Sequence, residues 1–372
     1  MRTLLLLLPL ALIGCNKPNP IEVGVEAVKR SERLQHLESC WRESTEAKRF
    51  LSALLVLFFY ANTALAFNLT PTSVKGLTQA YGFIAGQDYS LSQIENEFSE
   101  LATDIVFVRA QFNLTFPEIK AKLEKQLKLA MGERSFEEFK VGLPAKLKDT
   151  LGRQKITKEI AVNFLQKVKE RSNGEIESPV LEYLLAVEYA DNPAGEFADK
   201  FRKDFATDGT DKSLGIKLNM QLPRSWQAEI GKRPHIVQKW TSENGTGLEM
   251  ILLDIRDVQG YNPTKKEMEE FVRSGEVKEI VPEGSKYLAS GNFSLEKQHG
   301  YWIQMAMPLE RAGIKMFHNS LIYQFFFRGK AIGIVCQAGG SENEKSKIDD
   351  AFKRIQSLCQ RVLNSVVLPQ AY

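Results

Sequence analysis

Between residues 73 and 205, apolar side chains recur every three or four positions, which is the spacing of one face of an α-helix. One such stripe runs through Ile94, Phe98, Leu101, Ile105 and Val108. Gly, Pro and hydroxyl residues interrupt the pattern at intervals typical of helix lengths. This region is therefore predicted to be an all-helical domain of about five to seven helices with short connections.

Local signals predict where some of these helices begin and break. Ser92 and Glu95 have the spacing of a capping box, in which two side chains satisfy each other's backbone amides, and so do Thr115 and Glu118. Each pair predicts a helix start. Pro144 lacks an amide donor and is predicted to break the apolar pattern around it into two short helices.

From residue 215 the apolar period becomes alternating, which is typical of strands with one buried face. A short helix from Thr264 follows the third strand, and a capping box at Ser341 and Glu344 predicts the start of a long closing helix. The connections are short, so the strands are predicted to form an antiparallel sheet. The predicted strands are 215–222, 235–241, 247–256, 285–296, 301–309, 314–328 and 330–337.

Together these patterns predict an α+β protein, in which an N-terminal all-helical domain (73–205) precedes an antiparallel-sheet α/β/α sandwich (215–368). The polar, turn-rich residues 206–214 are the predicted linker. Phe325, Phe326 and Phe327 must alternate between sheet faces. All three are predicted to be buried if one helix covers each face.

The N-terminus has the organisation of an export leader: one Arg, a nearly unbroken apolar run, and then Gly14-Cys15. Residues 1–15 closely resemble the lipobox of bacterial lipoproteins. That resemblance implies cleavage between Gly14 and Cys15 and attachment of lipid to Cys15.

A second leader-like segment occupies residues 47–66. Lys48 and Arg49 precede an apolar run, and a small-residue pattern predicts cleavage between Ala66 and Phe67. The run is shorter than the ~20 residues of a membrane-spanning helix. Three alternatives stay open: a working signal behind a misassigned start, a membrane segment of a lipoprotein, or a buried core helix. The first two place the remainder of the chain outside the cytoplasm.

Charge balance and cysteine content bear on the class of partner and on the redox compartment. The 49 basic and 46 acidic residues nearly balance, which gives no indication of a nucleic-acid partner. Of the four cysteines, Cys336 and Cys359 follow both predicted cleavage sites. In an oxidising compartment they are candidates for a disulfide. The alternative is two buried free thiols.

No short motif predicts catalysis, a metal or a cofactor. The four histidines lie too far apart in sequence for ligand spacing, and no G-x-S-x-G or phosphate-loop pattern occurs. Ser225 and Ser290 lie in turn-like contexts, where a serine is usually structural. No catalytic residue, metal ligand or cofactor is therefore predicted.

The second half of the chain also resembles a known fold family. It has a Leu-Pro-x-x-Trp corner at Leu222–Trp226, three strands, a helix, four strands and a long helix ending near Leu368. This order is similar to the α/β/α sandwich of the photosystem PsbP domain and of Mog1-like and DcrB-like proteins. The resemblance implies a binding or assembly module rather than an enzyme. The helical domain has no counterpart in that family.

The sequence thus predicts an exported cell-envelope binding or assembly protein without catalytic activity. It would be lipid-anchored or periplasmic, with an envelope protein as partner and membrane contact through the N-terminal lipid or apolar segment. The alternative is a hydrolase-like envelope enzyme with a site in the inter-domain cleft. Delivery out of the cell as an effector is compatible with the first hypothesis, and no oligomeric state is predicted.

Overall fold

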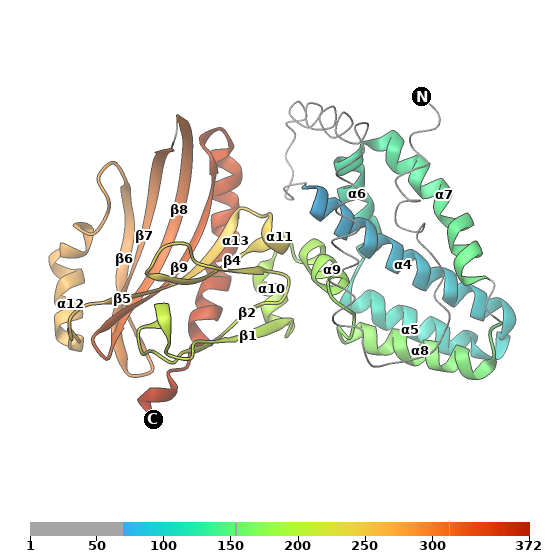
Figure 1. Ribbon diagram of the computed structural model, residues 1–372, viewed down its shortest axis with the longest axis horizontal. Helices are drawn as coiled ribbons and strands as arrows, with labels where there is room; N and C mark the ends of the chain where they lie inside the picture. The colour runs from blue at the N-terminus through green and yellow to red at the C-terminus, as the bar shows by residue number, and fades with distance from the viewer. Residues whose placement is uncertain (1–69, 153–154, 312) are drawn as a thin grey trace. The chain divides into compact units, whose positions relative to one another are not determined.

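The computed structural model describes residues 70–372, except 153, 154 and 312 (Figure 1). The predicted cleavage and lipidation positions Gly14, Cys15, Ala66 and Phe67, and both leader segments, lie outside the described residues. The described chain has helices first and an antiparallel sheet after them, which confirms the predicted α+β class. Among the described residues, no helix has both the length and the apolar character needed to cross a bilayer.

Six of the N-terminal helices share one apolar core, in which Leu77, Ile105, Leu123, Phe136 and Leu184 are buried. The short helix α10 instead contributes to the core beneath the sheet. The helices are α4 (Pro71–Glu97), α5 (Ala102–Thr115), α6 (Ile119–Met131), α7 (Glu133–Leu151), α8 (Lys158–Ser172), α9 (Val180–Glu188) and α10 (Pro193–Ala198).

Three predicted helix boundaries are wrong. Ser92 lies inside α4 and donates its hydroxyl to the carbonyl of Asp88, so it begins no helix. Thr115 is the last residue of α5 and donates to the carbonyl of Ser172. Pro144 lies inside the continuous helix α7, which loses one backbone hydrogen bond there without breaking.

The second half is a seven-stranded antiparallel sheet with strand order β3-β4-β5-β9-β8-β7-β6, accompanied by a separate two-stranded ribbon, β1-β2. The strands are β1 (Arg202–Ala206), β2 (Asn219–Pro223), β3 (Gln227–Ile230), β4 (Ile236–Thr241), β5 (Glu249–Asp257), β6 (Lys286–Leu295), β7 (Gln298–Arg311), β8 (Ile314–Phe327) and β9 (Lys330–Ser341). The residues predicted as a linker connect β1 to β2 and include a short helical turn, Asp211–Ser213. Strand β3 was not predicted.

Two helices lie on opposite faces of the sheet (Figure 1). Helix α13 (Lys345–Asn364), the predicted closing helix, buries an apolar stripe against β5, β8 and β9. Helix α12 (Lys265–Ser274) covers β6 and β7 on the other face. Phe325 and Phe327 are buried on the α13 side, and the partly buried Phe326 packs on the α12 side, as the alternation predicts.

The predicted start of α13 is also wrong. Strand β9 continues through Ser341, whose side chain makes no capping hydrogen bond, and a turn at Glu342–Glu344 precedes the helix. Cys336 of β9 and Cys359 of α13 are fully buried and joined by a disulfide, with their Cα atoms 6.1 Å apart. The bond ties the closing helix to the middle of the sheet.

Candidate functional site

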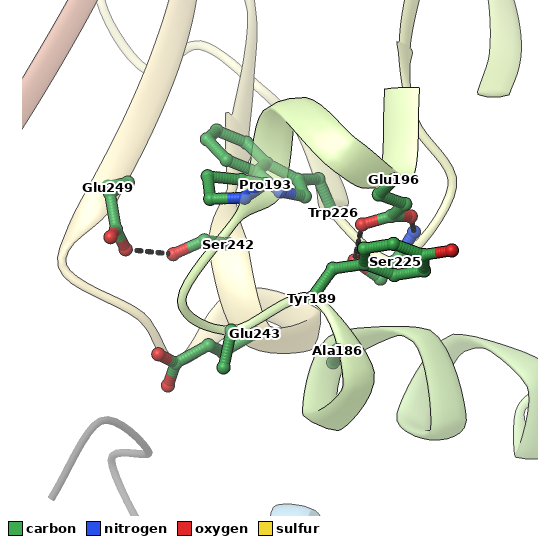
Figure 2. A pocket seen from close by; sticks show the side chains of 10 residues that line it. Ala186, Tyr189, Pro193, Glu196, Ser225, Trp226, Ser242, Glu243 and Glu249 are labelled. Carbon is green, nitrogen blue, oxygen red and sulfur yellow. Dashed lines mark hydrogen bonds between the residues drawn. The ribbon is translucent and has the colours of Figure 1, made fainter. Parts of the chain in front are cut away.

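The Leu222–Trp226 corner is fastened to α10 by a buried carboxylate. Glu196 of α10 accepts hydrogen bonds from the backbone N–H and from the hydroxyl of Ser225, both at 2.7 Å (Figure 2). Glu196 is 1% exposed and Ser225 is 2% exposed. Because both carboxylate oxygens are bonded to one residue, the contact fixes the chain reversal between β2 and β3.

The electrostatics of this corner are unusual. Burial raises the pKa of Glu196 to about 7, although the hydrogen bonds from Ser225 and the nearby Lys203 charge act in the opposite direction. Burial also lowers the pKa of Lys203. The Lys203 ammonium donates hydrogen bonds to the carbonyls of Trp226 and Arg224. Lys203 therefore connects β1 to the same corner.

A second buried carboxylate lies close by and is fully partnered. Glu249 of β5 accepts a hydrogen bond from the hydroxyl of Ser242 at 2.7 Å (Figure 2). It also accepts one from the guanidinium of Arg354 at 2.8 Å. Glu249 is 2% exposed, so the arginine of α13 neutralises a charge that would be costly to bury alone.

The loop between β4 and β5 holds a third carboxylate in a strained backbone. Glu243, Asn244 and Gly245 have φ values of 52°, 52° and 94°, all in the left-handed region. Two of the three are not glycine, and such strain is concentrated at functional positions in proteins. Figure 2 shows the Glu243 side chain directed away from Glu196.

Glu243 differs from the other two carboxylates in lacking a full set of partners. It is 5% exposed, and its Oε2 atom has no hydrogen-bond partner. Burial, together with the nearby Glu249 charge, raises its pKa well above the ordinary value. A backbone bond from Asn244 N–H to the Ser225 carbonyl, at 3.1 Å, links this loop to the corner.

The cavity among these groups is small. It has a volume of about 10 Å³, which is the space of one water molecule. A substrate does not fit there, and Ser225 is occupied by Glu196. The corner is therefore suited to holding the fold rather than to nucleophilic chemistry. Ser290, the other serine considered, lies on β6 and bonds the hydroxyl of Tyr287 at 2.9 Å.

A larger groove lies on the outer side of the corner and opens to solvent. Its volume is 410 Å³, within the range of ligand pockets. The groove contains two cationic side chains, Arg224 and Lys203, and one anionic side chain, Glu182. The Glu182 carboxylate lies 3.6 Å from the Arg224 guanidinium. The lining residues are Glu182, Lys203, Arg224, Trp226, Gln227, Ala228 and Asn244.

Of the groove residues, Trp226 belonged to a sequence signal, the Leu-Pro-x-x-Trp pattern, which marked one of the two loops that meet here. The other loop contains Asn244-Gly245, a dipeptide typical of tight turns. Glu196 carries no such signal, because it is 29 residues from Ser225 in sequence. Within the described part of the chain, no cluster of three or more His, Cys, Asp or Glu side chains has the arrangement of a metal site.

No protein-family model and no curated protein matches this chain. Among solved structures, it is similar to cyanobacterial PsbP from Synechocystis sp. PCC 6803, with 11% identity, a TM-score of 0.28, and 45% of this chain and 92% of that chain covered. It is similar to the Saccharomyces cerevisiae Ran-binding protein Mog1p, with 8% identity, a TM-score of 0.30, and 45% of this chain and 95% of that chain covered. It is also similar to LpqN, involved in cell envelope biogenesis of Mycobacterium tuberculosis, with 12% identity, a TM-score of 0.27, and 46% of this chain and 95% of that chain covered. PsbP and Mog1 are both named by the sequence resemblance. At these identities and TM-scores, the likenesses support no inference about activity or partner.

Proposed function

We propose that this protein is an exported cell-envelope binding or assembly protein, held at the membrane by lipid on Cys15 or released into the periplasm after Ala66. The observation that carries the proposal is the buried Cys336–Cys359 disulfide, because such bonds persist in oxidising compartments. The two leader-like segments independently support export from the cytoplasm.

A binding role is supported by the shape and chemistry of the two cavities. The cavity that contains a serine next to a carboxylate has room for one water molecule. The larger groove is lined by two cationic, one anionic, two amide and one aromatic side chain together with an alanine, and none of these seven residues is Ser, Thr, Cys or His. Such a lining recognises a partner by charge and hydrogen bonding.

Intact mass and N-terminal analysis of the protein recovered from fractionated cells tests the address. An acylated Cys15 identifies a lipoprotein, and an N-terminus at Phe67 identifies the second leader as the working one. Cys15→Ala and Ala66→Arg each block one of these routes and serve as controls for the other. An uncleaved chain in the cytosol with Cys336 and Cys359 reduced contradicts the proposal.

A further inference from the structure

Strand β3 is one edge of the seven-stranded sheet, and it is exposed. All four of its residues are accessible to solvent, and the Ile230 side chain is 73% exposed. An edge strand offers a row of backbone donors and acceptors to any chain that can lie beside it.

Hydrogen bonding defines which backbone groups face outward. The Gly231 N–H donates to the Val237 carbonyl of β4. In the same register Glu229 lies opposite Lys239 and Gln227 opposite Thr241, so the backbone N–H and C=O groups of the odd-numbered β3 residues face β4. In an antiparallel pair the direction alternates along the strand. Ala228 and Ile230 therefore direct their N–H and C=O groups away from the sheet.

Two lysines mark the ends of this free stretch. Lys203 donates to the carbonyl of Trp226 just before β3. Lys212 donates to the carbonyls of Gly231 and Arg233 just after it. Both ammonium groups bind backbone oxygens at the strand ends, and the stretch between them remains accessible.

The surroundings of the edge are cationic. Arg224 lies in the adjoining groove, and the exposed Lys232 and Arg233 follow the strand. On the acidic side, Glu229 is paired with Lys239 at 2.6 Å, and Glu182 faces Arg224. Positive charge therefore exceeds negative charge along β3 and into the 410 Å³ groove at its start.

We propose that the β3 edge and the adjoining groove bind an extended, acidic peptide segment of a partner protein by β-strand addition. The main-chain groups of Ala228 and Ile230 pair with the segment. Its acidic side chains face Arg224 in the groove and Lys232 and Arg233 beyond the strand. A lipid headgroup or a nucleic acid would satisfy the cations but not the outward N–H and C=O groups, so a peptide fits the surface better. This inference rests on the proposed binding role but not on export.

The test is selection of a randomised, surface-displayed peptide library with the purified full-length protein. The expected result is enrichment of acidic sequences without proline at their centre. Arg224→Glu weakens binding of the selected peptides by about tenfold or more, because one favourable charge becomes repulsive. Arg134→Glu is the matched control, because that side chain is 93% exposed on α7, and it leaves binding unchanged.

A second measurement tests strand addition without altering the fold. N-methylation of a selected peptide at alternate residues removes only the amides that face β3 or only those that face away. Binding is expected to be lost in one of the two series and kept in the other, and hydrogen exchange in residues 226–231 is expected to slow when peptide is bound. No enrichment, enrichment of basic sequences, or equal tolerance of both methylation series overturns the inference. A fractionation experiment that places the chain in the cytosol would defeat the proposed address and leave this result intact.

Discussion

Replacing Glu196 by glutamine removes a charge from the Leu222–Trp226 corner while preserving the shape of the side chain. Glutamine can still accept a hydrogen bond from Ser225 through its amide oxygen. What changes is the cost of burying a carboxylate that is 1% exposed. The variant therefore isolates the electrostatic contribution of this residue to folding.

The magnitude follows from the pKa of Glu196, which burial raises from 4.5 to about 7. Each pKa unit corresponds to about 1.4 kcal/mol, so this rise corresponds to about 3 kcal/mol. The folded state binds the Glu196 proton more tightly than the unfolded state does. Protonation of Glu196 therefore stabilises the fold; this contribution to the free energy of unfolding is fully present below pH 4.5 and is lost as the pH rises through 7. Glutamine has no such dependence.

Urea unfolding of the full chain, followed by tryptophan fluorescence from acidic to weakly alkaline pH, measures the difference. Relative to wild type, Glu196→Gln is expected to gain about 3 kcal/mol in the free energy of unfolding between pH 4.5 and pH values above 7. Glu159→Gln, at an exposed position of α8, is the matched control and shows no such gain. A difference between Glu196→Gln and wild type that is constant with pH, or that grows toward acid, refutes the reasoning.

Three further predictions concern stability and use the same urea assay. Replacing Cys336 and Cys359 by alanine lowers the free energy of unfolding by about 3 kcal/mol, the amount expected for a disulfide that closes a loop of this length. The variant is also expected to be insensitive to reductant, which destabilises the wild type. An unchanged urea midpoint would contradict a disulfide in the protein. Gly76→Ala lowers the free energy of unfolding by about 2 kcal/mol, because the added Cβ would lie 1.9 Å from the Tyr183 ring. Gly82→Ala in the same helix raises it by up to about 1 kcal/mol, because the added Cβ has no atom within 4 Å and alanine favours the helix. Equal effects of the two substitutions would refute the packing argument. Arg354→Met lowers the free energy of unfolding by about 3 kcal/mol, because it leaves the buried Glu249 carboxylate without its cation; an unchanged unfolding midpoint would contradict this argument.

The alternating pattern of β5 was predictable because this strand buries one of its two faces beneath a helix. In β5, the residues Ile251, Leu253 and Ile255 are fully buried beneath α13, and burial of this kind leaves a clear period in sequence. Strand β3 lacks that constraint, since all four of its residues are exposed. Its position at the edge of the sheet therefore left no apolar pattern to detect.

The helix boundaries were less predictable, because the same polar pattern fits more than one local structure. Ser92 has the spacing of a cap, but in α4 its hydroxyl bonds back to the preceding turn. The true cap of α4 is Thr70, whose side chain and that of Ser73 satisfy each other's backbone amides. Ser341 extends a strand because its partner on β8, Met316, continues the ladder beyond the point where the helix signal begins.

The candidate site shows why chemistry was harder to predict than fold. Glu196 lies on a six-residue helix whose sequence resembles many solvated helices, and only the packing of α10 against the sheet core buries it. Glu243 lies in the loop between β4 and β5, whose left-handed backbone was not predicted from the sequence. Burial, and not residue type, gives both carboxylates their raised pKa values. Because burial arises from segments distant in sequence, such a site becomes visible only once the corner, the loop and α10 have been brought together.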